Sequence, residues 1–279
     1  MSDDFSTRMQ SSMASLPATM RRVALYFDQN RAEVMSRSAS ELARTINTSD
    51  ASVIRTAKAL GYAGLPELKR SLADQMAEVT PAEAFDRTMK SANADARRAA
   101  AQTLLLQHSQ VAELQGEAQL ESLMSAAGIL HGARRIGLFG IGPTAHLTGY
   151  MAHLLLRHGR EVWQLDATGR GLADGLLGLR QGDAMLAFSY GRPYAEIELV
   201  VAEAAGLGIP VLLVTDNATG KLARQVDAVI AVPRGEARGM ALHGSTMVWL
   251  ETLVVALSLL GGSRTTTSLK RLSRLRSAL

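Results

Sequence analysis

Between residues 38 and 46 the hydrophobic positions follow a helical period behind a polar start signal. Ser38 and Glu41 have the S-x-x-E spacing of a capping box, in which each side chain satisfies a free backbone N–H at the start of a helix. Leu42 and Ile46 give this helix an apolar face. The pattern therefore predicts a short helix that begins at the capping box.

A second helical pattern follows after a polar break. Asn47 and Thr48 interrupt the first pattern, and Ser49 is a residue type that caps helices. The new helix should run to about Leu60 and stop at Gly61, because glycine is the preferred residue just past a helix C-terminus. The two patterns together predict a helix-turn-helix unit.

The predicted second helix has two different faces at about 100° per residue. Val53, Ala57 and Leu60 form an apolar stripe, and small, hydroxylic or basic residues lie opposite it. Small residues let a backbone approach the major groove, and an arginine can reach a guanine edge or a phosphate. A solvated helix surface has the same composition, so both interpretations stay open at this point. The candidate DNA-binding residues are Ser49, Ala51, Ser52, Arg55, Thr56 and Lys58.

From Arg135 onward, short apolar runs alternate with helical stretches. This alternation predicts a parallel sheet covered by helices on both faces, a three-layer αβα arrangement. The expected strands are Ile136 to Phe139, Glu161 to Leu165, Ala184 to Phe188, Val211 to Val214 and Ala228 to Val232. The fold class we predict is α plus α/β, with a five-stranded parallel sheet in the second part.

Two further segments have a helical composition. Residues 80–130 are rich in Ala, Leu, Gln and Glu, with Pro81 suited to a first helical turn, so we expect a helical linker there. After Glu251 the chain has no acid, and leucines recur at near-helical spacing among its basic residues. This pattern predicts a basic amphipathic helix that docks on a partner subunit, adds nonspecific DNA contacts or forms a solvated tail; we favour docking.

Three loops should meet at one edge of the predicted sheet, beyond the C-terminal ends of its strands. They follow the first, third and fourth strands, and each places small or hydroxylic residues before the next helical segment. Exposed backbone N–H groups and the positive end of a helix dipole attract an anion such as phosphate. The candidate ligand-binding residues are Gly140, Gly142, Thr144, Ser189, Gly191, Arg192, Thr215, Asn217 and Thr219.

Composition narrows the class of protein. The 279 residues, 47% of them hydrophobic, can fill two ordinary domains. The chain has no cysteine, which excludes disulfides and thiolate chemistry, and its six histidines lack metal spacing, so we expect no metal or cofactor. No run of about 18 uncharged apolar residues and no signal-peptide pattern occurs, which predicts a cytoplasmic protein without a membrane partner. Residues 21–70 carry nine basic residues against five acids, a modest footprint for phosphate contact.

Both the predicted helix-turn-helix unit and the predicted sheet resemble parts of one known family. The run from Ser38 to Lys69 is similar to the N-terminal domain of RpiR-type bacterial transcriptional regulators, most specifically in its last part, where Leu-Gly-Tyr at 60–62 is followed by Glu-Leu-Lys at 67–69. The three loops, in the order GxGxT, Ser-Tyr and Thr-Asp-Asn, resemble those of the sugar isomerase (SIS) domain that such regulators carry. The resemblance implies an operator DNA partner and a phosphosugar effector. We also expect a homodimer or homotetramer, because helix-turn-helix proteins commonly span two half-sites.

One loop departs from the pattern of that domain. Many phosphosugar-binding members have S-x-S-G-x-S/T after the third strand, whereas this chain has Gly191, Arg192 and Tyr194 at the last three defined places. Two hydroxyl ligands are therefore missing. Arg192 can replace them, because its guanidinium makes bidentate contacts with a phosphate or carboxylate. The alternative is that the pocket has changed to another ligand or has lost its ligand.

An enzyme is the alternative class. Gly140-x-Gly142-x-x-Ala145 fits a dinucleotide-binding fingerprint, with Asp166 about where a ribose-binding acid belongs. A sugar-phosphate isomerase is the other enzyme option, with His243 and Glu251 as proton-transfer candidates. No nucleophile, base and orienting group can be assembled, so we predict a regulator and not an enzyme. The expected division is a DNA-binding domain at 1–79, a linker at 80–130, a SIS domain at 131–262 and a basic tail at 263–279.

Overall fold

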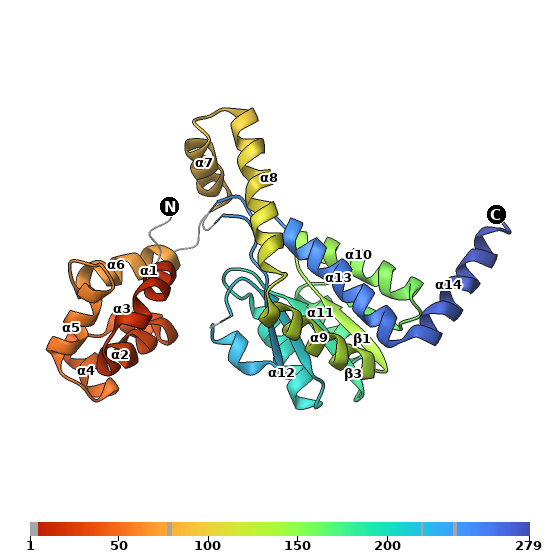
Figure 1. Cartoon of the computed structure of the whole chain (residues 1–279). Coiled ribbons are helices and arrows are strands. Elements are labelled where there is room, and N and C mark those ends of the chain that lie inside the picture. The colour runs from red at the N-terminus through yellow and green to blue at the C-terminus, as the bar shows by residue number, and fades with distance from the viewer. Residues whose placement is uncertain (1–4, 77–79, 219, 237–238) are drawn as a thin grey trace. The chain divides into compact units, whose positions relative to one another are not determined.

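The computed structural model describes residues 5–76, 80–218, 220–236 and 239–279, and the chain forms two compact units (Figure 1). The first unit extends to Thr80 and the second begins at Pro81. Each unit has its own hydrophobic core. The two are therefore described separately.

The first unit is built from helices around one apolar cluster. Its largest fully buried side chains include Phe5, Phe27, Leu42 and Leu68. The elements are α1 (Phe5–Ser12), the 3-10 helix η1 (Met13–Ser15), α2 (Ala18–Gln29), α3 (Arg31–Ser36), α4 (Ala39–Ile46), α5 (Asp50–Ala59) and α6 (Leu65–Met76).

The predicted start signals of α4 and α5 are confirmed. The Ser38 hydroxyl accepts from the Glu41 backbone N–H at 3.3 Å, and the Glu41 carboxylate accepts from the Ser38 N–H at 2.7 Å, a complete capping box. These bonds to Ser38 hold the pKa of Glu41 below its ordinary value. Ser49 caps α5 by accepting from the Ser52 N–H at 3.3 Å. The local signals therefore fix both helix N-termini.

The turns around α5 are also those that the sequence predicts. Asn47 takes a left-handed conformation (φ 56°) at the end of α4, which an asparagine tolerates better than most residues. Gly61 has φ 84°, and the next N–H, that of Tyr62, donates to the Ala57 carbonyl at 3.1 Å. This left-handed glycine ends α5 and turns the chain toward α6.

The second unit contains a five-stranded sheet in which every pairing is parallel, with strand order β2-β1-β3-β4-β5. All five predicted strands are confirmed. They are β1 (Arg135–Phe139), β2 (Val162–Leu165), β3 (Asp183–Phe188), β4 (Val211–Thr215) and β5 (Ala228–Ala231). The helical elements of this unit are α7 (Pro81–Ser91), α8 (Ala96–Glu113), α9 (Glu117–Gly132), α10 (Pro143–Arg157), α11 (Gly169–Leu176), α12 (Ala195–Gly206), η2 (Leu222–Gln225), α13 (Gly244–Leu260) and α14 (Gly262–Arg276).

Helices cover both faces of the sheet, as the three-layer prediction requires. On one face, α9, α10 and α13 bury residues such as Leu130, Met151 and Trp249 against the strands. On the other face, α11 and α12 bury Leu172 and Val200. β3 lies at the centre of the sheet and is buried at every position, as expected for a strand covered on both sides.

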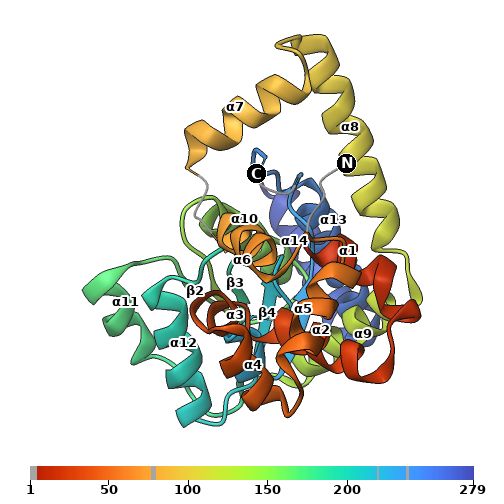
Figure 2. The ribbon, with the colours of Figure 1, turned by 90° about the vertical axis from the view of Figure 1, so that its left-hand side faces the viewer.

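The segment 80–130 differs in part from the linker that we expected. Pro81 does begin α7, and α7 and α8 extend from the body of the unit (Figure 2). The expected boundary at 131 falls inside α9, whose buried Ala126, Ala127 and Leu130 pack in the core with β5 and α13. The apolar positions of this helix did not stand out from its Ala-rich surroundings, although they form a layer of the sandwich.

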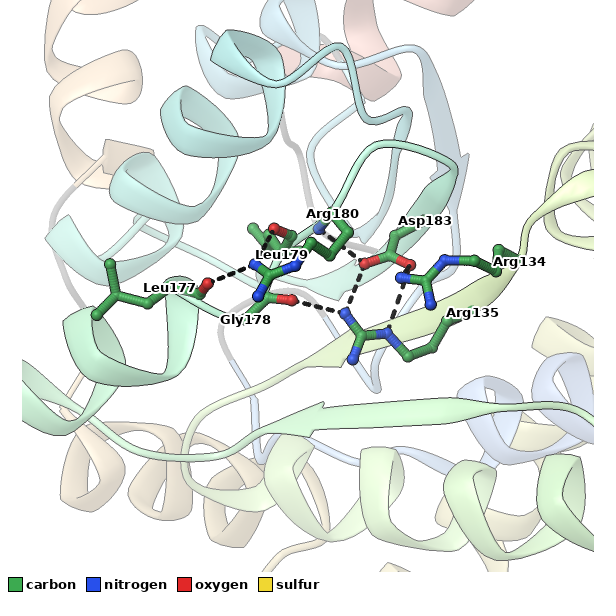
Figure 3. Close-up of polar contacts among 7 residues, drawn as sticks. All are labelled: Arg134, Arg135, Leu177, Gly178, Leu179, Arg180 and Asp183. Atoms are coloured by element: carbon green, nitrogen blue, oxygen red, sulfur yellow. Dashed lines mark hydrogen bonds and ion pairs between the residues drawn. The ribbon is translucent and has the colours of Figure 1, made fainter.

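A buried carboxylate joins the strands at the N-terminal edge of the sheet (Figure 3). Asp183 is 2% exposed and accepts from the guanidinium of Arg135 at 2.7 Å, that of Arg134 at 2.9 Å and the N–H of Arg180 at 3.0 Å. Parallel pairing brings Arg135 directly beside Asp183. The cluster therefore ties β1, β3 and the preceding loop together at the edge opposite the predicted ligand loops.

No single helix within the described ranges is long and apolar enough to cross a membrane. α13 and α14 pass that test only when taken together, and the chain bends by 106° between them. One side of α13 is used in packing, since Trp249, Leu250, Leu253 and Leu257 are buried in the core.

Candidate functional site

A cleft of about 380 Å³ lies at the C-terminal ends of β3 and β4. It is formed by the loop that leads into α12 and the loop that leads into η2. In a parallel sheet this edge gathers helix N-termini and loops, which is why ligands bind there. The lining residues are Ser189, Gly191, Arg192, Pro193, Ala195, Glu198, Leu213, Thr215, Asn217, Gly220, Lys221 and Leu222.

Ser189 is the most informative residue in this lining. It is 7% exposed, and its backbone N–H continues the sheet by donating to the Val214 carbonyl at 3.1 Å. Its hydroxyl makes no hydrogen bond with any described residue, although its oxygen is buried. A buried hydroxyl without a partner costs free energy, which marks a position where a ligand group can supply the missing bond.

The rest of the lining favours an anion on one side. Arg192 and Lys221 are exposed cations in the cleft wall. α12 begins beside them, and its N-cap residue Tyr194 makes no side-chain capping bond, so the first-turn N–H groups keep their capacity to bind a ligand. Glu198 contributes an exposed carboxylate from the first turns of the same helix. The cleft therefore offers donors and positive charge together with one acidic group.

Asp216 holds the two loops of the cleft in register. Its carboxylate accepts from the Gly191 N–H at 3.0 Å and pairs with the Arg234 guanidinium at 3.2 Å. Gly191 has φ 67°, and a Cβ there would lie 3.2 Å from the Arg234 Nη2 atom. The left-handed backbone conformation favours glycine here, and a larger residue would also shift the Arg234 guanidinium by a few tenths of an ångström.

Tyr190 connects the same loop to α13 on the other side. Its hydroxyl lies 2.8 Å from the Thr246 hydroxyl, and its ring meets the edge of the His243 ring at 5.2 Å. Burial raises the pKa of Tyr190 well above its ordinary value, and burial with the nearby Arg234 charge lowers the pKa of His243. Both side chains are therefore neutral packing groups at pH 7.

The predicted ligand residues divide into three groups. Ser189, Gly191, Arg192, Thr215 and Asn217 are brought together in the cleft wall. Gly140, Gly142 and Thr144 are not among its lining residues, and Thr219 lies outside the described residues.

The first loop is instead explained by local packing. The Thr144 hydroxyl accepts from the Ile141 N–H at 3.0 Å and donates to the Ile141 carbonyl at 2.8 Å. A Cβ at Gly140 would lie 2.8 Å from the Thr144 carbonyl oxygen, so a side chain there would push α10 away from β1. Gly142 has φ 61° at the N-cap of α10. These residues form the turn between strand and helix.

The exposed face of α5 is narrower than predicted. Ala51, Arg55 and Lys58 are exposed, as is Ser49 at the N-cap. Ser52 is 8% exposed and Thr56 is fully buried, with its hydroxyl bonded to the Ser52 carbonyl at 2.8 Å. The prediction that these two belong to a free surface is wrong.

The physical reason is that α2, α4 and α6 all pack on α5. Together they bury a wider arc of α5 than the apolar stripe of Val53, Ala57 and Leu60 alone. The sequence reasoning also missed Ile54, which is 39% exposed and shares the outward arc with Ala51 and Lys58. An apolar residue on an otherwise polar helix face was the available signal.

The residues considered for enzymatic proton transfer lie outside the cleft lining. His243 packs against Tyr190, and Glu251 accepts a hydrogen bond from the Tyr150 hydroxyl at 2.6 Å between α13 and α10. This bond raises the pKa of Tyr150. Within the part of the chain that the structure describes, no group of three His, Asp or Glu side chains could hold a metal ion.

Comparison with known families matches both units. Residues 4–79 match the helix-turn-helix domain of the rpiR family, and residues 129–261 match the SIS domain. The HTH-type transcriptional regulator RpiR of Escherichia coli strain K12 is 23% identical over 221 residues, which cover 77% of this chain and 72% of that protein.

Solved structures share the fold. The Vibrio vulnificus NanR protein, complexed with ManNAc-6P, aligns with a TM-score of 0.56 and 22% identity over 98% of this chain and 97% of NanR. The sugar isomerase domain of an RpiR transcription factor from Sphaerobacter thermophilus aligns with a TM-score of 0.52 and 21% identity, over 71% of this chain and 99% of that one. With an rpiR-family helix-turn-helix domain followed by a SIS domain, the chain belongs to the RpiR-type regulators.

Proposed function

We propose that this chain is a cytoplasmic transcriptional regulator that binds operator DNA through α5 and is controlled by a small anionic metabolite, a sugar phosphate, bound in the cleft of the SIS domain. It works as a homodimer, since helix-turn-helix proteins commonly bind two half-sites about one helical turn apart. The cleft senses its ligand and does not transform it.

The single observation that carries the effector proposal is the buried, unpartnered hydroxyl of Ser189 in a cleft that also presents Arg192 and Lys221. A phosphate accepts from hydroxyl, guanidinium and ammonium donors at once, and the first turn of α12 adds backbone N–H groups. Arg192 thereby compensates for the serine that the family pattern has at position 191. That NanR was solved with ManNAc-6P supports the same ligand class.

The outward face of α5 supports the DNA-binding part. Ala51 permits close approach to the major groove, Arg55 can reach a guanine edge or a phosphate, and Lys58 can neutralise a phosphate. Ile54 adds an apolar group that can contact a thymine methyl. Regulation follows if the effector prefers one relative arrangement of the two helix-turn-helix domains of the dimer, with a coupling free energy of about 1–3 kcal/mol between effector binding and DNA binding.

A thermal-shift screen of sugar phosphates and sugar acids tests the effector proposal. A compound that binds the folded state raises the melting temperature by mass action, by an amount set by its concentration relative to its Kd. We expect at least one sugar phosphate to stabilise the wild type and to lose this effect in Arg192→Ala. The matched control is Arg97→Ala, an exposed arginine on α8, which should keep the full shift. A ligand whose stabilisation survives Arg192→Ala would refute the role of this arginine, and a negative screen would refute the effector class.

A further inference from the structure

Helix α14 is only partly packed within its own unit. It leaves α13 at a bend of 106°, and its first turns lie against α10 and the turn that follows it, where a Cβ at Gly159 would be 3.1 Å from Arg264 and Ser268. Thr265 is 9% exposed and its hydroxyl donates to the His158 carbonyl at 3.5 Å. From Ser273 onward every side chain is exposed, and the helix points away from the sheet (Figure 1).

The sequence of α14 does not explain a stable free helix. Its first half contains Gly262 and three consecutive threonines, which are weak helix formers. Lys270 and Arg274 place like charges at i,i+4, which destabilises an isolated helix. Helices of about 15 residues are marginal in water without tertiary packing. The exposed half of α14 therefore needs a surface to pack on.

The chemistry of that surface can be read from the helix. Leu269, Leu272 and Leu275 recur on one side, where the first two are half-buried and Leu275 is 52% exposed. At about 100° per residue, Arg271 and Arg276 lie on or beside this stripe, whereas Lys270 and Arg274 lie on the opposite side, and no acid occurs after Glu251. A matching partner must offer exposed apolar side chains bordered by carboxylates.

Helix α9 offers such a surface. Its outward side carries Glu117, Leu120, Glu121 and Met124, at i, i+3, i+4 and i+7, and the two apolar residues are 42% and 49% exposed. Gly128 continues this side, and a Cβ placed there would meet nothing within 4 Å, so another helix can approach closely. Residues 99–133 contain no lysine or arginine, so no basic residue of α9 opposes a basic partner.

We propose that α14 of one protomer docks on α9 of a second copy of this chain, with its leucines on Leu120 and Met124 and with Arg271 and Arg276 beside Glu117 and Glu121. In its own unit α14 packs on α10 and α13 and runs outward, so another copy provides the acidic helix. A two-fold axis makes the exchange reciprocal, so each protomer both gives and receives a helix. The inference rests on the dimer proposed above and assigns its surface.

Charge reversal with rescue is the first test. Glu117→Lys/Glu121→Lys in α9, and separately Arg271→Glu/Arg276→Glu in α14, should each raise the dimer dissociation constant by at least about tenfold in sedimentation velocity. The chain carrying both sets should return to within about threefold of wild type, because the opposite charges again face each other. Asp174→Lys/Glu203→Lys, exposed helical positions on the other face of the sheet, is the matched control and should leave dimerisation unchanged. Circular dichroism confirms that each variant is folded.

Disulfide trapping gives an independent test, because the chain has no cysteine of its own. When Met124→Cys and Leu275→Cys proteins are mixed and oxidised, they should form a covalent heterodimer in higher yield than the covalent homodimer that either protein forms when it is oxidised alone. No heterodimer, or reversal variants that dimerise like wild type, would overturn the α9 surface while leaving a dimer through other elements. Loss of DNA affinity in the α14 variant with unchanged dimerisation would overturn it in favour of a phosphate-binding arm.

Discussion

Replacement of Ser189 by alanine should stabilise the ligand-free protein and abolish its response to the effector. The buried hydroxyl of Ser189 has no partner among the described residues, so removing it removes an unsatisfied group and not a bond. Alanine retains the Cβ, and the backbone N–H bond to Val214 at 3.1 Å is kept. The substitution therefore changes one oxygen atom at the cleft wall.

The size of the effect follows from the cost of an unsatisfied hydroxyl, about 1–3 kcal/mol. Removing the oxygen also removes its van der Waals contacts with the surrounding atoms, which offsets part of that gain, so the lower end applies and we expect a gain of about 1 kcal/mol. For a unit of this size, that gain raises the melting temperature by about 2–4 °C. Few substitutions stabilise a protein, so the sign itself is diagnostic.

Differential scanning calorimetry measures the effect, first without and then with the sugar phosphate found in the screen. The matched control is Ser245→Ala, because Ser245 is fully buried but its hydroxyl donates to the Pro233 carbonyl. Removing that satisfied hydroxyl should lower the melting temperature. If Ser189→Ala also lowers it by several degrees, or keeps the effector-induced shift, then Ser189 is a structural residue and the reasoning fails.

Three further predictions follow from the two units. Arg55→Ala should weaken operator binding by about 1–3 kcal/mol in mobility-shift titrations, and Lys58→Ala should reduce the salt slope by about one; an Arg55→Ala protein that binds like wild type would remove this residue from the reading face. Asp183→Ala should destabilise the SIS domain by about 3 kcal/mol and lower its melting temperature by roughly 6–12 °C, because two arginines lose their buried carboxylate partner. Arg180→Ala keeps the backbone bond to Asp183 and should cost much less stability. Burial and the Arg234 charge hold the pKa of His243 below its ordinary value. Its contribution to stability is therefore complete above about pH 6.5 and declines as the pH falls, because the unfolded chain then takes up the proton more readily than the folded protein. Urea unfolding at about pH 7.5 and about pH 5.5 should show a smaller loss of stability on acidification for His243→Gln than for the wild type, and an equal loss would contradict this role.

Short-range signals explain why much of the fold follows from the sequence. The capping box at Ser38, the N-cap at Ser49 and the left-handed Gly61 act within one helical turn, so they determine α4 and α5 wherever the unit packs. The five strands follow in the same way from short apolar runs between helical stretches. The match between the loop after β3 and the SIS pattern also located Ser189 and Arg192 in the cleft.

Interactions between distant segments were decided only by the tertiary structure. Thr56 is buried because several helices surround α5, and no local pattern reports how many neighbours a helix will have. Parallel pairing places Arg135 beside Asp183, 48 residues apart, which depends on strand order and register. The loop at Gly140 has the composition of a ligand loop, yet the Thr144 hydroxyl bonds with the Ile141 backbone and Gly140 allows the close contact of β1 with α10.

The sequence by itself thus determined α4, α5, the five strands and the identity of both domains, because helix caps, hydrophobic periods and family motifs are local properties of a chain. The tertiary structure decided which hydroxyl is left without a partner, which helix surfaces stay exposed and which two of three similar loops form a cleft. Those properties depend on what lies opposite each side chain, and long-range packing supplies that neighbour.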